Sequence, residues 1–270
     1  MPSKRTTGLA AALVLLLSLV VGLLLPVGPA SALYAGEPNI IHAGSSYGWY
    51  PALFRDEFRG PLKSVWHKSG RGVVRTTNGM LTLKTGRSGS VAATLTTAGH
   101  PTGRWEVGVK TRQYGSAHTP YTALTELIPA GGRPQYCGAR NIALQSYTEG
   151  RSRVHFSIHN LPNVAFVASK GGKPFGGDHW HTFAVEVTTT HISWFIDAHV
   201  VSTERRPEAY SGVPLTLRFT LHAVPGQVMS PARMQVDWAR YWTLAKHDRK
   251  SISAPAPRMT TFGRACPPAA

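Results

Sequence analysis

Short runs of alternating apolar and polar residues recur along most of this 270-residue chain. They are rich in β-branched and aromatic residues, they lack the three-to-four-residue apolar spacing of a helix, and Gly, Pro and Asn clusters separate them. The clearest runs are GMLTLKT, GRWEVGVKTR, RVHFSIHN, HTFAVEVT, HISWFIDAHVV, PLTLRFTLHAV and MQVDWARYWTL. This pattern predicts an all-β fold, an antiparallel sandwich in which each sheet has one apolar face.

The first 32 residues have the features of a signal peptide. Lys4 and Arg5 precede an apolar stretch over residues 9–25, and Ala30 and Ala32 supply the small residues that a signal peptidase recognises. We expect cleavage after Ala32 and a protein that is secreted, in the extracellular space or at the cell wall, without membrane contact. The alternative is an uncleaved anchor, because the stretch approaches the ~20 residues that span a bilayer.

The remaining chain is expected to form one domain. We assign residues 33–53 to an N-terminal lead-in, 54–244 to the sandwich, and 245–270 to a tail whose Pro, Ala and Ser content cannot bury enough surface to fold alone. The two cysteines, Cys137 and Cys266, favour a disulfide in an exported protein, which would tether this tail. Two unpaired thiols are the alternative, because a bridge needs Cα atoms within roughly 7 Å.

The charge of the chain is strongly positive. Without the signal peptide the net charge is about +14 with neutral histidines. Such a field favours polyanionic partners, among them acidic cell-wall polymers, or it is a solubilising surface alone. The basic residues are scattered and no nucleic-acid-binding motif accompanies them, so we expect no specific nucleic acid as a partner and a monomeric protein.

Several segments, in one order, resemble glycoside hydrolase family 16, the laminarinase and lichenase group, from about residue 54 to 244. They are FRDEFRGPLKSVWH, NGMLTLKT, GRWEVGVKTR, DHWHTFAVEVTTTHISWFIDAHVV and MQVDWARYWTL. The resemblance implies a jelly-roll sandwich of two curved antiparallel sheets, of the concanavalin A-like type. It also implies that the concave sheet holds an extended polysaccharide, such as a β-glucan, in a cleft.

The strand that carries catalysis in this family reads Glu-x-Asp-x-Glu, or a version with one extra residue. Here the matching strand reads NIALQ, so the resemblance places Asn141 at the nucleophile, Ala143 at the aspartate and Gln145 at the acid/base. Neither amide can act as a nucleophile or transfer a proton near neutral pH. Neither carboxylate spacing occurs elsewhere in the chain.

Further cleft residues follow from the same resemblance. On the preceding strand, YTALTELIP, Thr122 and Glu126 replace two tryptophans of the family. Glu126 is either a carboxylate displaced into the cleft or a solvated strand residue. Tyr121, Tyr136 and Tyr147 could supply aromatic faces for sugar rings.

The histidines near the cleft have two interpretations each. His159 resembles a family histidine next to the catalytic strand, and it either contacts sugar or is satisfied inside the sheet. His179 and His181 have the spacing of metal ligands on one strand face, but His181 matches a structural histidine of the family. We therefore expect no metal site there and no cofactor, apart from a structural Ca²⁺ that some relatives carry. Glu149 is interpreted as a turn residue.

Two functions remain open from the sequence. The first is a binding protein on a glycosidase scaffold, a pseudoenzyme in which Asn141 and Gln145 donate hydrogen bonds to sugar hydroxyls together with Glu126, His159, Tyr121 and Tyr147. The second is an active endo-acting glycosidase that uses a displaced carboxylate such as Glu126. The chemistry of the NIALQ strand favours the first function, although fold resemblance alone favours the second.

Overall fold

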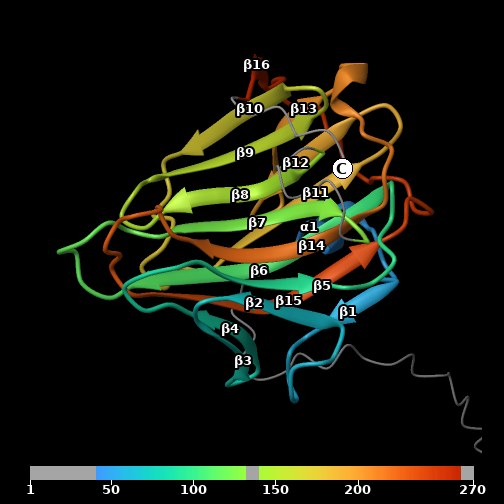
Figure 1. The fold of residues 1–270 in the computed structure, drawn as a ribbon. Helices are drawn as coiled ribbons and strands as arrows, with labels where there is room; N and C mark the ends of the chain where they lie inside the picture. The colour runs from blue at the N-terminus through green and yellow to red at the C-terminus, as the bar shows by residue number, and fades with distance from the viewer. Residues whose placement is uncertain (1–40, 132–139, 263–270) are drawn as a thin grey trace, which may run out of the picture. The chain divides into compact units, whose positions relative to one another are not determined.

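A computed structural model describes residues 41–131 and 140–262 (Figure 1). The predicted signal peptide, Tyr136, Cys137 and Cys266 lie outside these residues, and so does the predicted disulfide. Within the described ranges, no helix is long and apolar enough to cross a membrane.

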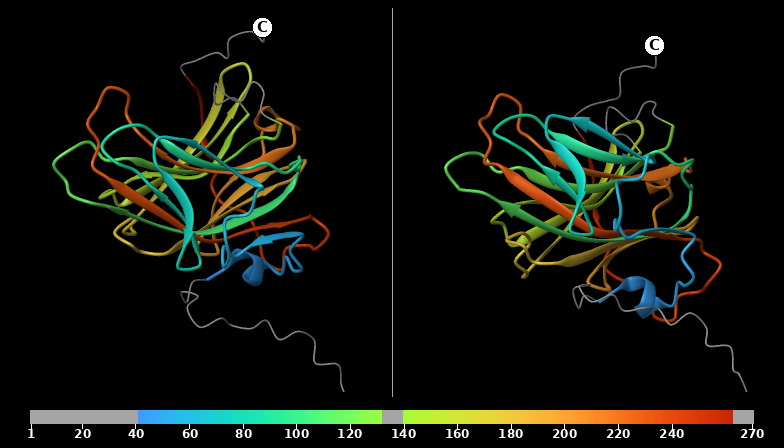
Figure 2. Two further views of the ribbon diagram at one scale, coloured as in Figure 1. Left: turned by 60° about the horizontal axis from the view of Figure 1, so that its bottom comes forward. Right: turned by 90° about the horizontal axis from the view of Figure 1, so that it is seen from below.

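Two antiparallel sheets make up the fold, which confirms the predicted sandwich (Figures 1 and 2). Sheet A has the order β13-β12-β11-β6-β15-β4-β3, with β1 paired to β15. Its strands are β1 (Phe54–Asp56), β3 (Val73–Thr77), β4 (Met80–Lys84), β6 (Gly103–Gln113), β11 (His181–Val187), β12 (Ile192–Ile196), β13 (His199–Glu204) and β15 (Ala232–Trp242).

Sheet B contains the strand that matches the catalytic strand of the family. Its order is β16-β10-β9-β8-β7-β14-β5-β2. The strands are β2 (Trp66–Gly70), β5 (Val91–Leu95), β7 (Thr122–Pro129), β8 (Ile142–Thr148), β9 (Arg153–Asn160), β10 (Val164–Gly171), β14 (Leu215–His222) and β16 (Arg258–Thr261). Two short helices, α1 (Ala43–Tyr47) and η2 (Pro207–Ala209), complete the described elements.

Alternation along each strand separates the core between the sheets from the outer faces. In β14, Leu215, Leu217, Phe219 and Leu221 are buried in the core. The intervening residues Thr216, Arg218, Thr220 and His222 line a pocket on the other side of sheet B. Because successive side chains of a strand point to opposite faces, the same rule identifies the outward residues of every strand.

The described part of the N-terminal lead-in, residues 41–53, packs against sheet A of the sandwich. α1 and Trp49 cover the outer face of sheet A and bury a second apolar cluster there. The cluster contains Ala43, Tyr47, Trp49, Ala184, Phe195 and Trp242. The rings of Trp49 and Trp242 meet edge to face with centroids 5.5 Å apart, a favoured aromatic geometry.

The structure describes the tail up to residue 262, and residues 245–262 belong to the same compact unit as the sandwich. Ser202 and Thr203 of β13 donate hydroxyl hydrogen bonds to the backbone carbonyls of Pro255 and Ile252. The tail then forms β16, which pairs with β10 in sheet B. The expectation that only Cys266 could order this segment is therefore wrong, because side chains of the sheet satisfy its backbone groups.

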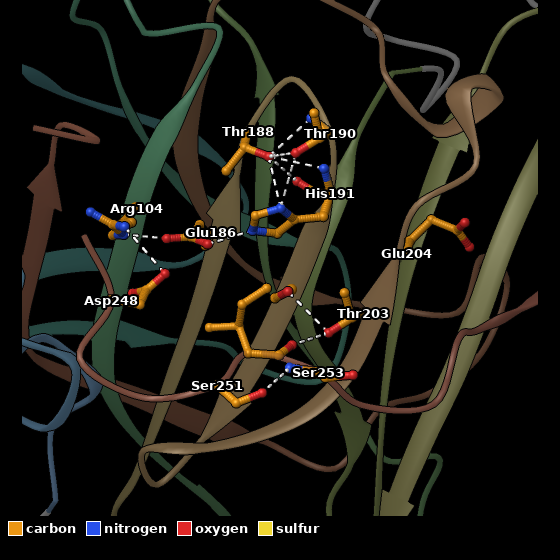
Figure 3. A network of polar contacts seen from close by, with 12 residues as sticks. Arg104, Glu186, Thr188, Thr190, His191, Thr203, Glu204, Asp248, Ser251 and Ser253 are labelled. Carbon is orange, nitrogen blue, oxygen red and sulfur yellow. Dashed lines mark hydrogen bonds and ion pairs between the residues drawn. The ribbon is translucent and has the colours of Figure 1, made fainter. Parts of the chain in front are cut away.

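A buried polar network holds the start of this tail on sheet A (Figure 3). The Arg104 guanidinium bonds to the Glu186 carboxylate and lies 3.4 Å from Asp248 Oδ2. Glu186 Oε1 is 2.6 Å from His191 Nε2, and Trp49 Nε1 donates to Asp248 Oδ1 at 2.6 Å. Burial alone would raise the pKa of Glu186, but bonds to His191 and Arg104 hold it below its usual value.

Replacing Glu186 by Gln should destabilise the protein by about 3 to 5 kcal/mol, because it removes a charge from a buried ion pair and leaves Arg104 undercompensated. Urea unfolding followed by tryptophan fluorescence measures this. Glu208→Gln removes an exposed carboxylate and should change stability by less than about 0.5 kcal/mol. Equal stabilities of the two variants would contradict a structural role for the network.

The Glu106 side chain in β6 holds the first residues of α1 on sheet A. Its carboxylate accepts hydrogen bonds from the backbone N–H groups of Ala43 and Gly44, and it is completely buried. Burial raises the pKa of Glu106 to about 7, although these two bonds and the charge of Arg240 lower it. Because the folded protein holds this proton more tightly than the unfolded chain, the contribution of Glu106 to stability is present below pH ~4.5 and is lost as the pH rises through about 7.

The stability difference between the native protein and Glu106→Gln should therefore shift by roughly 3 kcal/mol between pH 4.5 and pH 8, against the native protein at the higher pH. Urea unfolding at pH 4.5, 6 and 8 tests this. The comparison with Glu106→Gln is needed because burial lowers the pKa of His42 to about 4, which acts with the opposite sign. A pH-independent difference would contradict the assignment.

Candidate functional site

A β-bulge in β8 determines which residues reach the outer face of sheet B. Ala143 pairs with Ser157 and Ser146 pairs with His155, so three steps along β8 match two along β9. On the other side, Thr125 pairs with Gln145 and Glu126 pairs with Ala143. β8 therefore has one extra residue between Ala143 and Ser146.

The bulge turns Gln145 into the core. Its side chain is completely buried, and its Nε2 donates to Thr125 Oγ1 at 2.9 Å. Leu144 also lies in the core cluster, whereas Ser146 is partly exposed and pairs with Leu124 and His155. The outer face thus carries Asn141, Ala143 and Ser146. This corrects the expectation that Gln145 contacts sugar, and it matches the family pattern with one extra residue.

Glu126 lies on the same outer face, next to Ala143, and is held by two neighbours. Arg218 of β14 donates to Glu126 Oε1 through Nε at 2.9 Å and through Nη2 at 2.7 Å. Asn141 Nδ2 donates to Glu126 Oε2 at 2.8 Å. Both carboxylate oxygens are therefore engaged. The sequence analysis missed Arg218, although alternation in PLTLRFTLHAV places it on the outer face.

A pocket of about 560 Å³ lies beside this cluster, over β2, β5 and β14. Nine of its fourteen lining residues have polar side chains, the others and the threonine methyl groups give it apolar surface, and Arg218 connects it to Glu126. The polar lining residues are His67, Ser69, Thr94, Thr96, Thr97, Thr216, Arg218, Thr220 and His222. Such a surface can exchange hydrogen bonds with the hydroxyls of a sugar, and Ile128 and Pro129 add an apolar wall.

Of the three predicted aromatic faces, Tyr136 lies outside the described residues and the other two do not line this site. Tyr121 and Tyr147 are each about 2 % exposed and belong to the core. The Tyr121 hydroxyl donates to the carbonyls of Gly86 and Gly89, and the Tyr147 hydroxyl lies 3.0 Å from Thr111 Oγ1. The expectation that both rings line the cleft is wrong, because each hydroxyl finds a buried partner and the ring fills the core.

The histidines divide between the two sheets. His159 neighbours Asn141, whose carbonyl accepts its backbone N–H at 2.9 Å, and its ring stacks on Phe262 with centroids 4.5 Å apart. His181 Nδ1 lies 3.0 Å from the Asp197 carboxylate, away from β8. His179 lines a separate pocket, together with Glu149, between the β8–β9 turn and the segment before β11.

Glu149 has a structural environment. Its carboxylate accepts hydrogen bonds from the Thr111 hydroxyl and the backbone N–H of Gly177, which joins the turn after β8 to a distant loop. Among the residues that the structure describes, no three His, Cys, Asp or Glu side chains gather to hold a metal ion.

The bulge leads to a test by two single substitutions. Gln145→Glu places an unpaired carboxylate in the core, which should destabilise the protein by about 3 kcal/mol or more at pH 7, with recovery at low pH as the group protonates. Ser146→Glu, on the outer face, should change stability by less than about 1 kcal/mol. Thermal unfolding at pH 5 and pH 7 distinguishes them. The reverse order would show that Gln145 faces the cleft.

Known proteins resemble this chain in fold rather than in sequence. No family model matches the chain, and no curated protein matches its sequence. Solved structures do match. The laminarinase from Rhodothermus marinus is 17 % identical, with a TM-score of 0.58 over 72 % of this chain and 98 % of that one.

Two further structures have different specificities. SCLam, an endo-β-1,3(4)-glucanase from family GH16, is 15 % identical over 77 % of this chain and 94 % of its own, with a TM-score of 0.57. A GlcNAcα1-4Gal-releasing endo-β-galactosidase from Clostridium perfringens is 14 % identical over 78 % of this chain and 66 % of its own, with a TM-score of 0.56. The chain therefore has the jelly-roll sandwich fold of the glycoside hydrolase family 16 enzymes.

Proposed function

We propose that this protein binds an extended polysaccharide across the outer face of sheet B and does not hydrolyse it. The observation that carries the proposal is the chemistry of that face. Among all eight strands of sheet B, Glu126 is the only carboxylate, and Arg218 and Asn141 occupy both of its oxygens. The sequence of residues 132–139, which precede β8, contains no Asp or Glu.

Glycoside hydrolysis normally needs two carboxyl groups. They stand about 5 Å apart in retaining enzymes and about 6.5 to 9.5 Å apart in inverting enzymes. The three positions that face outward at the bulge are Asn141, Ala143 and Ser146, none of which can form a glycosyl ester under neutral conditions or protonate a leaving oxygen. A binding role therefore fits the face better than a hydrolytic one.

The same face suits recognition of neutral sugars. Asn141 Oδ1 accepts no hydrogen bond from the described residues, and because it is buried the side chain must rotate before this oxygen can accept one from a sugar hydroxyl. The adjoining pocket adds hydroxyl groups from Ser69, Thr94 and Thr220 and ring nitrogens from His67 and His222. We propose a β-glucan as the ligand. Support comes from the fold neighbours, several of which are glucanases by name.

We also propose that the protein acts outside the cytoplasm. The support is the signal-peptide pattern of residues 1–32, which ends in Ala30 and Ala32.

The test pairs a binding assay with a hydrolysis assay. The protein should bind laminarin or mixed-linkage glucan and release no reducing ends. Thr94→Trp fills the pocket and should weaken binding at least tenfold, about 1.4 kcal/mol. Thr189→Trp, in the exposed turn between β11 and β12, is the matched control and should bind like the native protein.

A different result would assign the site to catalysis. Hydrolysis by the native protein that disappears in Glu126→Gln would show that a displaced carboxylate performs the chemistry. Binding that is unchanged in Thr94→Trp would place the glycan elsewhere.

A further inference from the structure

A second surface, on the outer face of sheet A, carries a regular group of cations. We call Arg75, Lys84, Lys110, Arg112 and Arg233 the basic face. In the strand register Lys84 lies opposite Arg233, and Arg233 lies opposite Arg112. These three residues therefore form a row across β4, β15 and β6, with neighbouring strands about 4.8 Å apart.

The other two cations belong to the adjacent row. Gln235 lies opposite both Thr82 and Lys110, and Thr82 lies opposite Arg75. This half of sheet A is distinct from the half under α1, whose apolar cluster involves β11, β12 and the end of β15. It is also on the opposite side of the sandwich from the pocket over β2, β5 and β14.

Like charges directly opposite one another destabilise a sheet unless an anion lies between them. Asp178 lies between two residues of the basic face and pairs with both, with Arg112 at 3.1 Å and with Arg233. Although partial burial would raise it, Arg233, Arg112 and Lys110 hold the pKa of Asp178 below its usual value. The five cations of the basic face and Asp178 together carry a formal charge of about +4.

Aromatic rings hold two of these side chains in place. Lys110 Nζ lies 4.7 Å from the ring centre of Trp180, and Arg112 Cζ lies 5.6 Å from that of Tyr114. Cation–π contacts of this kind reduce the conformational freedom that a ligand would otherwise have to remove. Arg233 Nε is buried and has no hydrogen-bond acceptor among the described residues.

We propose that the basic face binds an acidic polysaccharide that carries carboxylate groups along its chain. A row of uronate carboxylates can meet the row of cations across the strands, and guanidinium groups match carboxylates in a forked geometry. This site is independent of the glycan site on sheet B. The protein would thereby join a neutral polysaccharide on one face to an acidic one on the other.

The structure favours this partner over two other polyanions. The basic face is a sheet surface with no helix or ribbon that could enter a nucleic-acid groove, and a cation already lies over the Trp180 and Tyr114 rings that bases would stack on. Val73 and Tyr114 are the exposed large apolar residues described in or beside its strands, and Arg112 lies over the Tyr114 ring, so little apolar surface is available to enter a lipid bilayer.

The experiment compares two triple variants of the full secreted protein. Arg75→Gln, Lys84→Gln, Lys110→Gln removes three charges and leaves the Arg112, Asp178 and Arg233 pairs intact. Its control, Lys68→Gln, Arg151→Gln, Arg205→Gln, removes three exposed charges outside the basic face. Biolayer interferometry measures binding to polygalacturonate, laminarin, single-stranded DNA and phosphatidylserine vesicles, with circular dichroism to verify folding.

The expected result is that polygalacturonate binding weakens at least tenfold in the first variant and less than threefold in the control, and that it declines with added salt. Laminarin binding should be equal in all three proteins, which separates this proposal from the one on sheet B. Equal losses in the two variants, or no binding of polygalacturonate, would overturn it. So would tighter binding of DNA or vesicles through the same three residues.

Discussion

Apolar packing between the two sheets decides which residues of this chain can meet a ligand. Every strand residue either fills the space between the sheets or lies on an outer face, and the core claims Leu, Ile, Val and most of the aromatic side chains. What remains outside sheet B is mainly hydroxyl and imidazole groups with one ion pair, Glu126 to Arg218. The bulge in β8 displaces the alternation of inward and outward side chains by one residue. The consecutive residues Leu144 and Gln145 both point into the core, and Tyr147 also lies in the core.

The sheets and their faces could be predicted because burying one side of a strand requires alternation, and alternation is visible in the sequence. The β-bulge in β8 could not be predicted in this way. Residues on both sides of it still alternate, and a glutamine within NIALQ has no local sign that its partner will be the buried Thr125. The expectation that Tyr121 and Tyr147 line the cleft was wrong for a related reason. A tyrosine can fill a core when its hydroxyl finds a partner, and those partners, the Gly86 and Gly89 carbonyls and Thr111, come from distant segments.

The two outer faces have opposite chemistry although they belong to one small domain. On sheet B the single carboxylate and its arginine neutralise each other, and the surrounding groups suit uncharged hydroxyls. On sheet A the cations outnumber the carboxylate that pairs with them. Composition gives the positive net charge of the chain but not its distribution. In the structure, part of this charge is concentrated on the outer face of sheet A. The buried network around Arg104 and Glu186 occupies the other half of that same sheet, where α1 and the tail cover it.

The last strand has a consequence for how copies of this protein behave toward one another. Without β16, the eight residues of β10 would form the open edge of sheet B, and an unpaired backbone edge is a template for another chain. β16 replaces that edge with a four-residue strand that begins with an exposed arginine, and hydrogen bonds from β13 hold the segment that leads to it. The tail therefore covers an edge of the sheet that could otherwise pair with another chain. Proteolytic loss of β16 would expose the backbone of β10 to aggregation while leaving the outer faces of both sheets in place.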